Sequence, residues 1–311
     1  MQIPKDLYPF EGKVLDLEGL RYHYLDEGQG EPIVMVHGNP SWSFYYRNLV
    51  KELRGEYRTI VPDHIGCGFS DKPGDDKYSY TLSRRVEDLT ALIDHLALEQ
   101  RITLVLHDWG GMIGMAYAAK HPERIGRIVL FNTAAFHLPA SKKLPTSLAV
   151  MRSSRAGALL VRGFNAMSRG TSLIGCKRKP MPKAVRDAYG APYDSWDNRI
   201  ATLRFVQDIP IAPTDPSYAA VTEVEESLSR FTNTPALICW GERDFVFDRE
   251  VLAIWRARWP NAEVHGFADC GHYVLEDAAE DITPLVKAFL QAHPLGAQPS
   301  GARNLPNPRV T

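Results

Sequence analysis

The chain has 311 residues, of which 44% are hydrophobic and 23% are charged, and its formal net charge at pH 7 is -1. This composition is ordinary for a globular protein, and the length is sufficient for one large core with an inserted subdomain. A net charge so close to zero provides no general attraction to nucleic acid or to an anionic membrane, so we expect no nucleic-acid partner.

The cysteines and the amino terminus favour a reducing compartment. The four cysteines lie far apart and form no C-x-x-C pair, which argues against a zinc site and against a secreted disulfide framework. The first residues contain no apolar segment of the kind found in signal peptides, and no apolar run is long enough to span a membrane. These features predict a cytoplasmic protein with reduced thiols and no membrane span.

The first part of the chain alternates between strand and helix patterns. Two strands joined at Glu18-Gly19 form an opening hairpin. Continuous apolar runs then predict strands buried on both faces, and Thr81 is a suitable N-cap for an amphipathic helix. The predicted strands are 13–17, 20–26, 33–36, 59–61, 102–106 and 127–131, and the predicted helices are 82–96 and 110–120. Such alternation predicts a mostly parallel sheet with helices on both faces.

The alternation stops between residues 135 and 220. Prolines divide this stretch into short helical pieces, and no buried strand is predicted in it. The pattern then resumes with strands 235–240 and 262–267 and helices 249–258 and 280–290.

We therefore predict an α/β fold with an inserted helical cap. Residues 1–134 form the first half of the core, residues 135–220 form the cap, and residues 221–293 form the second half of the core. Residues 294–311 are rich in Pro, Gly, Ala and Asn, which predicts a disordered tail.

One polar residue, Asp108, interrupts an apolar strand just before a helix of small residues, in the sequence Val-Leu-His-Asp-Trp-Gly-Gly. This is the layout of a nucleophile elbow, in which a sharp turn between strand and helix exposes one side chain. A carboxylate stands where a hydrolase of this pattern normally has serine, so the predicted intermediate is an ester formed by attack on an electrophilic carbon. The simpler alternative is that Asp108 only caps the helix. Leu106 departs from the pattern, because a small residue is usual there.

Two further polar residues follow predicted strands at the same sheet edge. Asp244 follows strand 235–240, and His272 follows the next strand. The chain order of nucleophile, acid and histidine is that of the α/β hydrolases. We predict a triad in which Asp244 orients His272 and His272 draws a proton from the water that attacks the Asp108 ester. Nearby carboxylates that compete with Asp244 for this role are Glu242 and Asp248.

Three motifs resemble those of the haloalkane dehalogenase family. They are residues 37–44 (HGNPSWSF), 63–73 (DHIGCGFSDKP) and 107–111 (HDWGG), and the likeness extends over residues 7–291. The resemblance implies the α/β-hydrolase fold. It is greatest to the third subfamily, which also contains the β-lactone decarboxylases of bacterial long-chain olefin biosynthesis.

The resemblance also implies that Asn39 and Trp109 bind the leaving halide. Displacement of halide from carbon builds negative charge on the leaving atom, and uncharged N–H donors in a dry pocket stabilise that charge. The backbone N–H groups of the same two residues then serve as the oxyanion hole. The simpler alternatives are that Asn39 is a turn residue before Pro40 and that Trp109 only packs the pocket wall.

Three enzymatic functions fit these residues. The first is hydrolytic dehalogenation, which converts a haloalkane to an alcohol and halide. The second, implied by the resemblance, is a lyase reaction in which Asp108 opens a long-chain β-lactone, and loss of carbon dioxide gives a cis-alkene. The third is epoxide hydrolysis, which needs acidic hydroxyl groups from the cap. Tyr189, Tyr193 and Tyr218 are the candidates, but the loop Asp63-His64-Ile65-Gly66 lacks the arginine usual in epoxide hydrolases.

The remaining polar features predict no cofactor and no metal site. No metal-ligand cluster or dinucleotide fingerprint is present, and His37 and His107 are expected to be structural residues that form hydrogen bonds in their loops. The resemblance implies that the substrate is a small hydrophobic molecule, either a haloalkane or a long-chain β-lactone.

The cap is rich in basic residues with almost no acidic neighbours in the sequence. A solvated basic face is the simpler interpretation. The functional alternative is a docking surface for a second copy of the chain or for a pathway enzyme. The basic residues are Arg152, Arg155, Arg162, Arg169, Lys177, Arg178, Lys179, Lys183 and Arg186.

Overall fold

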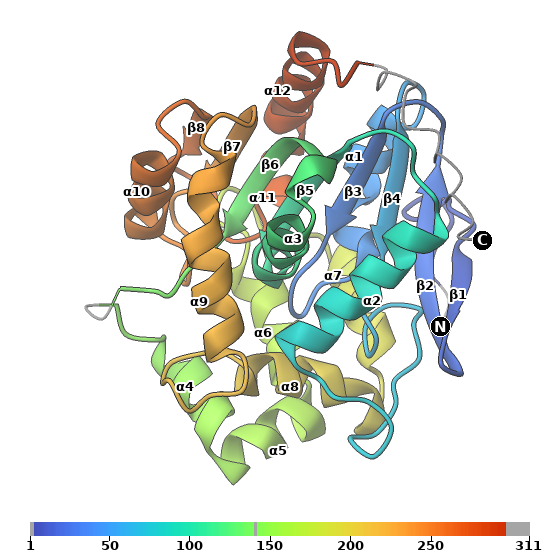
Figure 1. Cartoon of the computed structure of the whole chain (residues 1–311). Coiled ribbons are helices and arrows are strands. Elements are labelled where there is room, and N and C mark those ends of the chain that lie inside the picture. The colour runs from blue at the N-terminus through green and yellow to red at the C-terminus, as the bar shows by residue number, and fades with distance from the viewer. Residues whose placement is uncertain (1–2, 140–141, 297–311) are drawn as a thin grey trace, which may run out of the picture.

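A central eight-stranded sheet organises the protein in the computed structural model, which describes residues 3–139 and 142–296 (Figure 1). Its strands are β1 (Lys13–Leu17), β2 (Leu20–Glu27), β3 (Pro32–Val36), β4 (Arg58–Pro62), β5 (Ile102–Asp108), β6 (Ile125–Thr133), β7 (Ala236–Gly241) and β8 (Glu263–Phe267). They are arranged in the order β1-β2-β4-β3-β5-β6-β7-β8. The pairs β1–β2 and β2–β4 are antiparallel and the rest are parallel. The predicted mostly parallel sheet is thus confirmed.

Helices cover both faces of this sheet (Figure 1). The core helices are α1 (Arg47–Leu53), α2 (Leu82–His95), α3 (Trp109–Lys120), α9 (Tyr218–Ser227), α10 (Arg249–Arg258), α11 (Val274–Asp277) and α12 (Ala279–Ala292). Helices α2, α3 and α9 pack side by side on one face, and α1 packs with α12 on the other. Within the described residues, no helix combines the length and the apolarity needed to cross a bilayer.

The sequence explains why these elements form. Strands β3, β5 and β6 are buried along their whole length, as expected for continuous apolar runs covered on both faces. The side chain of Thr81 accepts a hydrogen bond from the backbone N–H of Arg84, so the predicted N-cap of α2 is confirmed. Because the parallel strands run in the same direction, β5 and β7 deliver Asp108 and Asp244 to one edge of the sheet.

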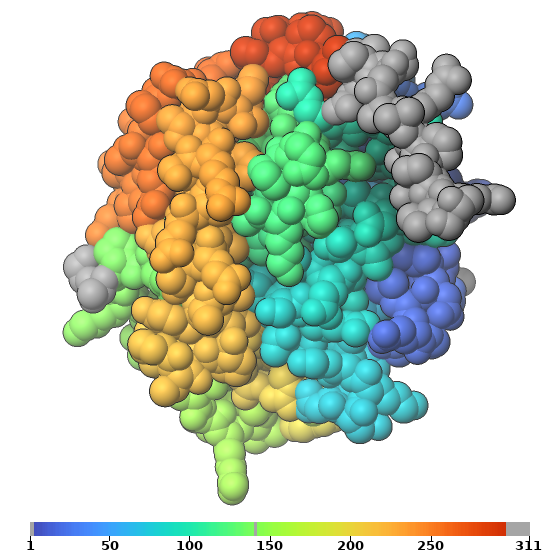
Figure 2. Space-filling view, in the orientation of Figure 1, coloured from blue at the N-terminus to red at the C-terminus, as the bar shows by residue number. Residues whose placement is uncertain are grey.

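Five short helices lie over that edge. They are α4 (Thr146–Ser153), α5 (Arg155–Phe164), α6 (Ala166–Ile174), α7 (Lys183–Gly190) and α8 (Ile200–Gln207). Their light green and yellow surface forms the lower end of the molecule (Figures 1 and 2). A small apolar cluster of their own includes Leu148, Val161, Met167, Leu203 and Val206. The next helix, α9, crosses residue 220, where we placed the end of the cap, and packs against α3 of the core.

The start of the predicted tail is packed against the core. Leu295 is only 4% exposed, and its backbone N–H donates to Glu31. Gly126 makes room for it, because a Cβ atom there would lie 2.2 Å from a Leu295 methyl carbon. The prediction of disorder from residue 294 is therefore wrong for its first residues, which have an apolar anchor, and residues 297–311 lie outside the described residues.

We expect Gly110→Ala to destabilise the fold, because a Cβ atom there would lie 1.9 Å from the backbone oxygen of Val36 and would force α3 away from β3. The expected loss in unfolding free energy is about 1–3 kcal/mol, measured by chemical denaturation. Gly170→Ala is the matched control, since Gly170 lies within α6 with open space around its Cα. The control should be neutral or stabilising by about 0.5–1 kcal/mol. Equal stability of the two variants would contradict the close packing of α3 on β3.

Candidate active site

Asp108 stands at a strained turn between β5 and α3. Its φ and ψ angles are 52° and -127°, outside the regions that non-glycine residues normally occupy. Such strain is most often retained where it orients a functional side chain. The Thr133 hydroxyl donates to the backbone carbonyl of Asp108 and holds the turn from β6. The geometry is that of the predicted elbow rather than of a helix cap, because the Asp108 side chain makes no capping hydrogen bond.

Leu106 fits this elbow because the helix supplies the missing space. A Cβ atom on Gly114 of α3 would lie 2.3 Å from a Leu106 methyl carbon. The small residue expected on the strand is therefore replaced by a small residue on the facing helix. This exchange accounts for the departure from the sequence pattern.

The carboxylate of Asp108 is held between a backbone donor and a histidine. Its Oδ1 accepts a hydrogen bond of 2.6 Å from the backbone N–H of Asn39, and its Oδ2 lies 3.9 Å from Nε2 of His272. Gly38 permits this approach, since a Cβ atom there would lie 2.0 Å from Oδ1. Burial raises the pKa of Asp108, although the positive charge on His272 and the nearby backbone N–H groups oppose the rise. The negative charge of the side chain is therefore stabilised from two directions while the carboxylate remains shielded from water.

His272 is oriented by Asp244. Its Nδ1 donates a hydrogen bond of 2.8 Å to Oδ2 of Asp244, and Oδ1 of Asp244 accepts the backbone N–H of Val246 at 2.7 Å. Burial alone would lower the pKa of His272, but the carboxylates of Asp244 and Asp108 together raise it above its ordinary value. The structure thus brings the three predicted triad residues together, with the imidazole between two carboxylates.

The competing carboxylates face elsewhere. Glu242 forms an ion pair with Arg249, and Asp248 caps α10 and forms an ion pair with Lys142. Neither side chain contacts His272. Asp244 is therefore the carboxylate that this geometry selects for the histidine.

His37 and His107 form hydrogen bonds beside the site, as predicted, although His107 lies at the end of β5 and not in a loop. His107 donates from Nε2 to the backbone carbonyl of His272 at 2.9 Å. His37 donates to the carbonyl of Gly38, and its Nε2 accepts the backbone N–H of His64. Burial lowers the pKa of both imidazoles. Their hydrogen bonds hold the segments that carry Asn39 and His272 without adding charge to the site.

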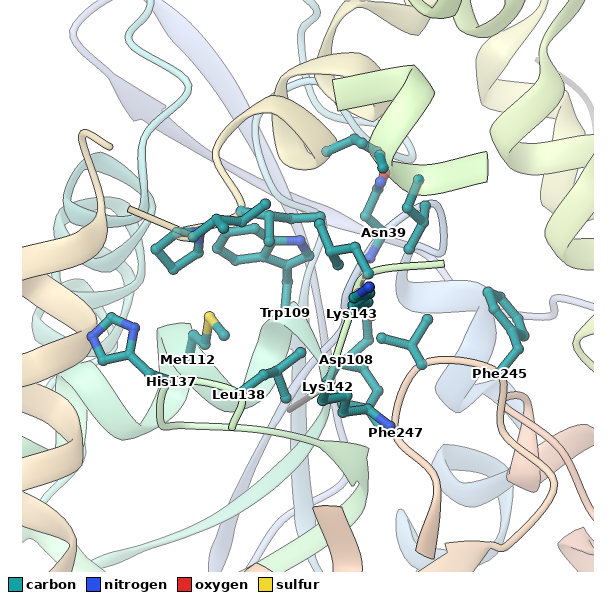
Figure 3. A pocket seen from close by; sticks show the side chains of 18 of the residues that line it. Asn39, Asp108, Trp109, Met112, His137, Leu138, Lys142, Lys143, Phe245 and Phe247 are labelled. Atoms are coloured by element: carbon teal, nitrogen blue, oxygen red, sulfur yellow. Dashed lines mark hydrogen bonds between the residues drawn. The ribbon is translucent and has the colours of Figure 1, made fainter. Parts of the chain in front are cut away.

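Asn39 and Trp109 both line the cavity next to Asp108 (Figure 3). The side-chain amide of Asn39 donates to the carbonyl of Thr202 in α8 at 3.2 Å, which leaves its second hydrogen free. The Asn39 side-chain oxygen is buried without a hydrogen-bond partner among the described residues. The indole N–H of Trp109 makes no hydrogen bond to another described residue. Two uncharged N–H donors are thus available beside the carboxylate.

The cavity has a volume of about 630 Å³, within the range of roughly 300–1,000 Å³ typical of small-molecule sites. Met112 and His137 lie on one side of Asp108, and Phe245 lies on the other (Figure 3). Most of the lining is apolar and comes from α3, the segment between β6 and α4, the cap helices, the segment after α8 and the loop after Asp244. This lining was not predicted from the sequence, although the run Phe245-Val246-Phe247 directly after Asp244 indicates an apolar wall.

The hydroxyl groups proposed for epoxide chemistry are mostly engaged outside the cavity. Tyr189 donates to Glu276 at 2.6 Å, and Tyr193 donates to the backbone carbonyl of Ser41. Among the three tyrosines, only Tyr218 lines the cavity. No group of side chains in the described part of the chain has the arrangement of a metal site.

The basic cap residues are less free than the sequence suggested. Five of the nine form ion pairs with acidic residues, several of them distant in the sequence. Our expectation that they are almost unopposed is therefore wrong for these five, because the fold brings distant carboxylates to four of them and Lys183 pairs with a carboxylate one turn further along its own helix. The pairs are Arg152–Asp215, Arg162–Asp197, Arg178 with Asp269 and Asp281, Lys179–Glu280 and Lys183–Asp187.

Comparisons with known proteins agree with this architecture. Residues 31–279 match the family model described as alpha/beta hydrolase fold. The chain is 57% identical over 284 residues to a cis-3-alkyl-4-alkyloxetan-2-one decarboxylase from Shewanella oneidensis, covering 91% of this chain and 89% of the relative. It is 33% identical to a haloalkane dehalogenase from Mycobacterium marinum, covering 88% and 92%. The crystal structure of the haloalkane dehalogenase DatA from Agrobacterium tumefaciens superposes with a TM-score of 0.80 at 25% identity, covering 91% and 96%.

We expect Asp244→Asn to lower the pKa of His272, because burial then acts with less opposition from negative charge. The imidazolium form should be lost at a lower pH than in the unmodified protein, as followed by NMR titration of the imidazole. Asp248→Asn is the control, because Asp248 does not contact His272. An unchanged His272 titration in Asp244→Asn would mean that Asp244 does not set the charge of the imidazole.

Proposed function

The chain belongs to the alpha/beta hydrolase fold family, and within this family we propose that it decarboxylates cis-3-alkyl-4-alkyloxetan-2-ones, which are disubstituted β-lactones. The strongest support is the 57% identity over 91% of the chain to the Shewanella oneidensis decarboxylase. From the sequence we expected dehalogenation first and lactone decarboxylation second. The lower identity of 33% to the Mycobacterium marinum dehalogenase favours the reverse order.

The shape of the cavity supports a substrate with two substituents. The ring carbons C3 and C4 of the lactone each carry an alkyl chain, so the substrate extends in two directions from the reacting ring. Apolar side chains line the cavity on both sides of Asp108, with Met112 and Leu138 on one side and Phe245 on the other (Figure 3). Burial of both chains against these walls would hold the ring over the carboxylate.

We infer two chemical steps, both of which use Asp108. In the first, an Asp108 oxygen attacks C4, the bond from C4 to the ring oxygen breaks, and an ester forms while the ring oxygen becomes part of a carboxylate on C3. In the second, the bond from C3 to that carboxylate breaks and its electron pair forms the alkene. The ester bond breaks at the same time, which releases carbon dioxide and restores Asp108. No water and no net proton are consumed.

Attack at C4 also accounts for the cis geometry. Displacement inverts C4 and places the ester oxygen opposite the carboxylate on C3. The two leaving groups are then anti to each other without rotation about the C3–C4 bond, and both alkyl chains remain on the same side. A cis-lactone therefore gives a cis-alkene.

The surrounding residues would stabilise the charges of these steps. The N–H groups of Asn39 and Trp109 are suited to the carboxylate that forms when the ring opens. His272, whose pKa is raised by Asp244 and Asp108 against the effect of burial, is suited to donate a hydrogen bond from Nε2–H to the Asp108 oxygen as the ester breaks. In hydrolysis, by contrast, the same imidazole must be neutral to draw a proton from water.

We expect the purified protein to release cis-alkene from a long-chain cis-β-lactone, detected by gas chromatography with mass detection. Asp108→Ala should abolish the alkene, because the ester cannot form. His272→Phe should slow alkene formation but retain many turnovers, since no water has to be activated. Alkene formation that persists in Asp108→Ala would contradict the proposed mechanism.

Dehalogenation remains a second candidate, favoured by the two uncharged N–H donors beside Asp108. The donors from Asn39 and Trp109 suit a halide as well as a carboxylate. In this reaction the ester has no neighbouring carboxylate to expel it, so water must attack the ester with His272 as the base.

We expect any halide release from 1-bromobutane to fall on the order of 10²-fold in kcat for Trp109→Phe, because one N–H donor is lost. Trp196→Phe is the matched control, because Trp196 is exposed and does not line the cavity. His272→Phe should release at most one halide per protein, since the ester then persists. Sustained halide release by His272→Phe would contradict a hydrolytic role for the histidine.

A further inference from the structure

One face of helix α5 is apolar and exposed. Ala156, Leu159, Leu160, Gly163 and Phe164 are all exposed, and their spacing places them on a single side of the helix. The exposed fractions of Leu159, Leu160 and Phe164 are 52%, 42% and 62%. The opposite side is buried, with Gly157 packed against the backbone of Val150 in α4. The side of α5 that faces solvent is therefore apolar, whereas the exposed side of a surface helix is normally polar.

The apolar face continues beyond α5. Trp196 is 45% exposed and lies beside Gly163, since a Cβ atom on that glycine would be 3.8 Å from the indole ring. Of the nine large hydrophobic side chains that are exposed in the described residues, eight lie between Val150 and Ile211. Such a concentration on one part of a molecule is typical of an interaction surface. We call Val150, Leu159, Leu160, Phe164 and Trp196 the docking face.

The docking face has exposed cations beside it that carry no ion pair in the described part of the chain, although Asp194 and Asp197 flank Trp196 and Asp197 pairs with Arg162. From Arg124 to Arg186 the chain contains no Asp or Glu. Arg155 and Arg169 are exposed and form no ion pair with another described residue. Arg199 donates to the carbonyls of Arg162 and Gly163 at the end of α5. Although the whole chain is nearly neutral, this end of the molecule presents cations beside apolar side chains.

Some residues that line the cavity lie on the cap elements next to the docking face. Ala149 of α4 lines the cavity directly before Val150 in the chain. Ile211 and Lys143 also line the cavity, and both are exposed to solvent. Helices α4 and α5 form the lower tip of the molecule, away from the sheet (Figure 1). A surface in contact with the docking face would therefore be close to this part of the cavity lining.

We propose that the docking face binds the surface of an anionic lipid bilayer. Leu159, Leu160 and Phe164 would enter the boundary between head groups and acyl chains, while Arg155 and Arg169 would lie against the lipid phosphates. Dialkyl β-lactones are apolar enough to partition into such a bilayer. Their transfer into the cavity, which rests on the proposed function, would then avoid a passage through water.

A lipid surface fits this face better than a protein does. A second copy of the docking face would place the exposed and unpaired Arg155 and Arg169 of one copy near the same arginines of the other, whereas an anionic bilayer supplies negative charge to them. The helix also presents no polar side chain along its apolar stripe that could fix the register of a protein partner. An anionic bilayer meets both requirements, because it supplies negative charge and a fluid apolar layer.

The test measures binding of the full chain to vesicles by flotation at physiological salt, without any substrate. We expect binding to vesicles of phosphatidylcholine with about one third phosphatidylglycerol, and little binding to phosphatidylcholine alone. High salt should weaken binding because it screens the arginines. Leu160→Asp with Phe164→Asp, and separately Arg155→Glu, should each reduce binding at least tenfold. Val14→Asp is the matched control, since Val14 is 44% exposed on β1, and it should bind like the unmodified chain.

Three results would overturn the proposal. They are failure of the unmodified chain to bind anionic vesicles, equal binding by the docking-face variants, and a protein dimer that the same variants abolish. Light scattering coupled to size exclusion detects the last of these. Turnover of detergent-dispersed lactone is measured in parallel and should be unchanged in all variants. An unmodified chain that does not turn over the lactone would contradict only the proposed function. An unmodified chain that turns over the lactone but does not bind anionic vesicles would contradict only the docking proposal.

Discussion

The site depends on the close approach of helix α3 to strand β3. Gly110 lets the helix begin against the backbone of Val36, and Gly38 lets the Asp108 carboxylate lie against the next loop. This approach holds Asp108 in a backbone conformation that an aspartate in solution would seldom adopt. The favourable packing of the surrounding sheet and helices offsets the energetic cost of that strain. As a result, the carboxylate already faces the backbone N–H of Asn39 before any substrate is bound.

The three titratable groups of the site form one electrostatic unit. His272 lies between two carboxylates that raise its pKa, and the charges of His272 and Asp244 act in opposite directions on the pKa of Asp108. Burial disfavours every isolated charge in this region. The attraction between the imidazolium and the two carboxylates that flank it opposes that cost. The neutral His107 supports the loop without adding a further charge. The loop that carries His272 is therefore held in place by a neutral group, and the charge of His272 depends on the two carboxylates.

The sequence was sufficient to predict local structure and the meeting of the triad. Period and apolarity gave the buried strands β3, β5 and β6, and the direction of parallel strands then determined that Asp108 and Asp244 share an edge. The sequence could not predict what depends on contacts between distant residues. Nothing local indicates that Gly114 accommodates Leu106, that Asp269 and Asp281 neutralise Arg178, or that Leu295 packs on Gly126. The directions of Tyr189 and Tyr193 likewise follow from cap packing.

The same site suits both proposed reactions because the fate of the ester depends on the substrate. A lactone opened at C4 carries a carboxylate on the adjacent carbon, so its own electron pair can expel Asp108. An alkyl halide leaves no such group, and its ester must wait for water. A cavity lined mainly by apolar side chains keeps water scarce, which slows hydrolysis but does not affect a step that consumes no water. An apolar enclosure around a carboxylate nucleophile therefore favours the decarboxylase over the hydrolase.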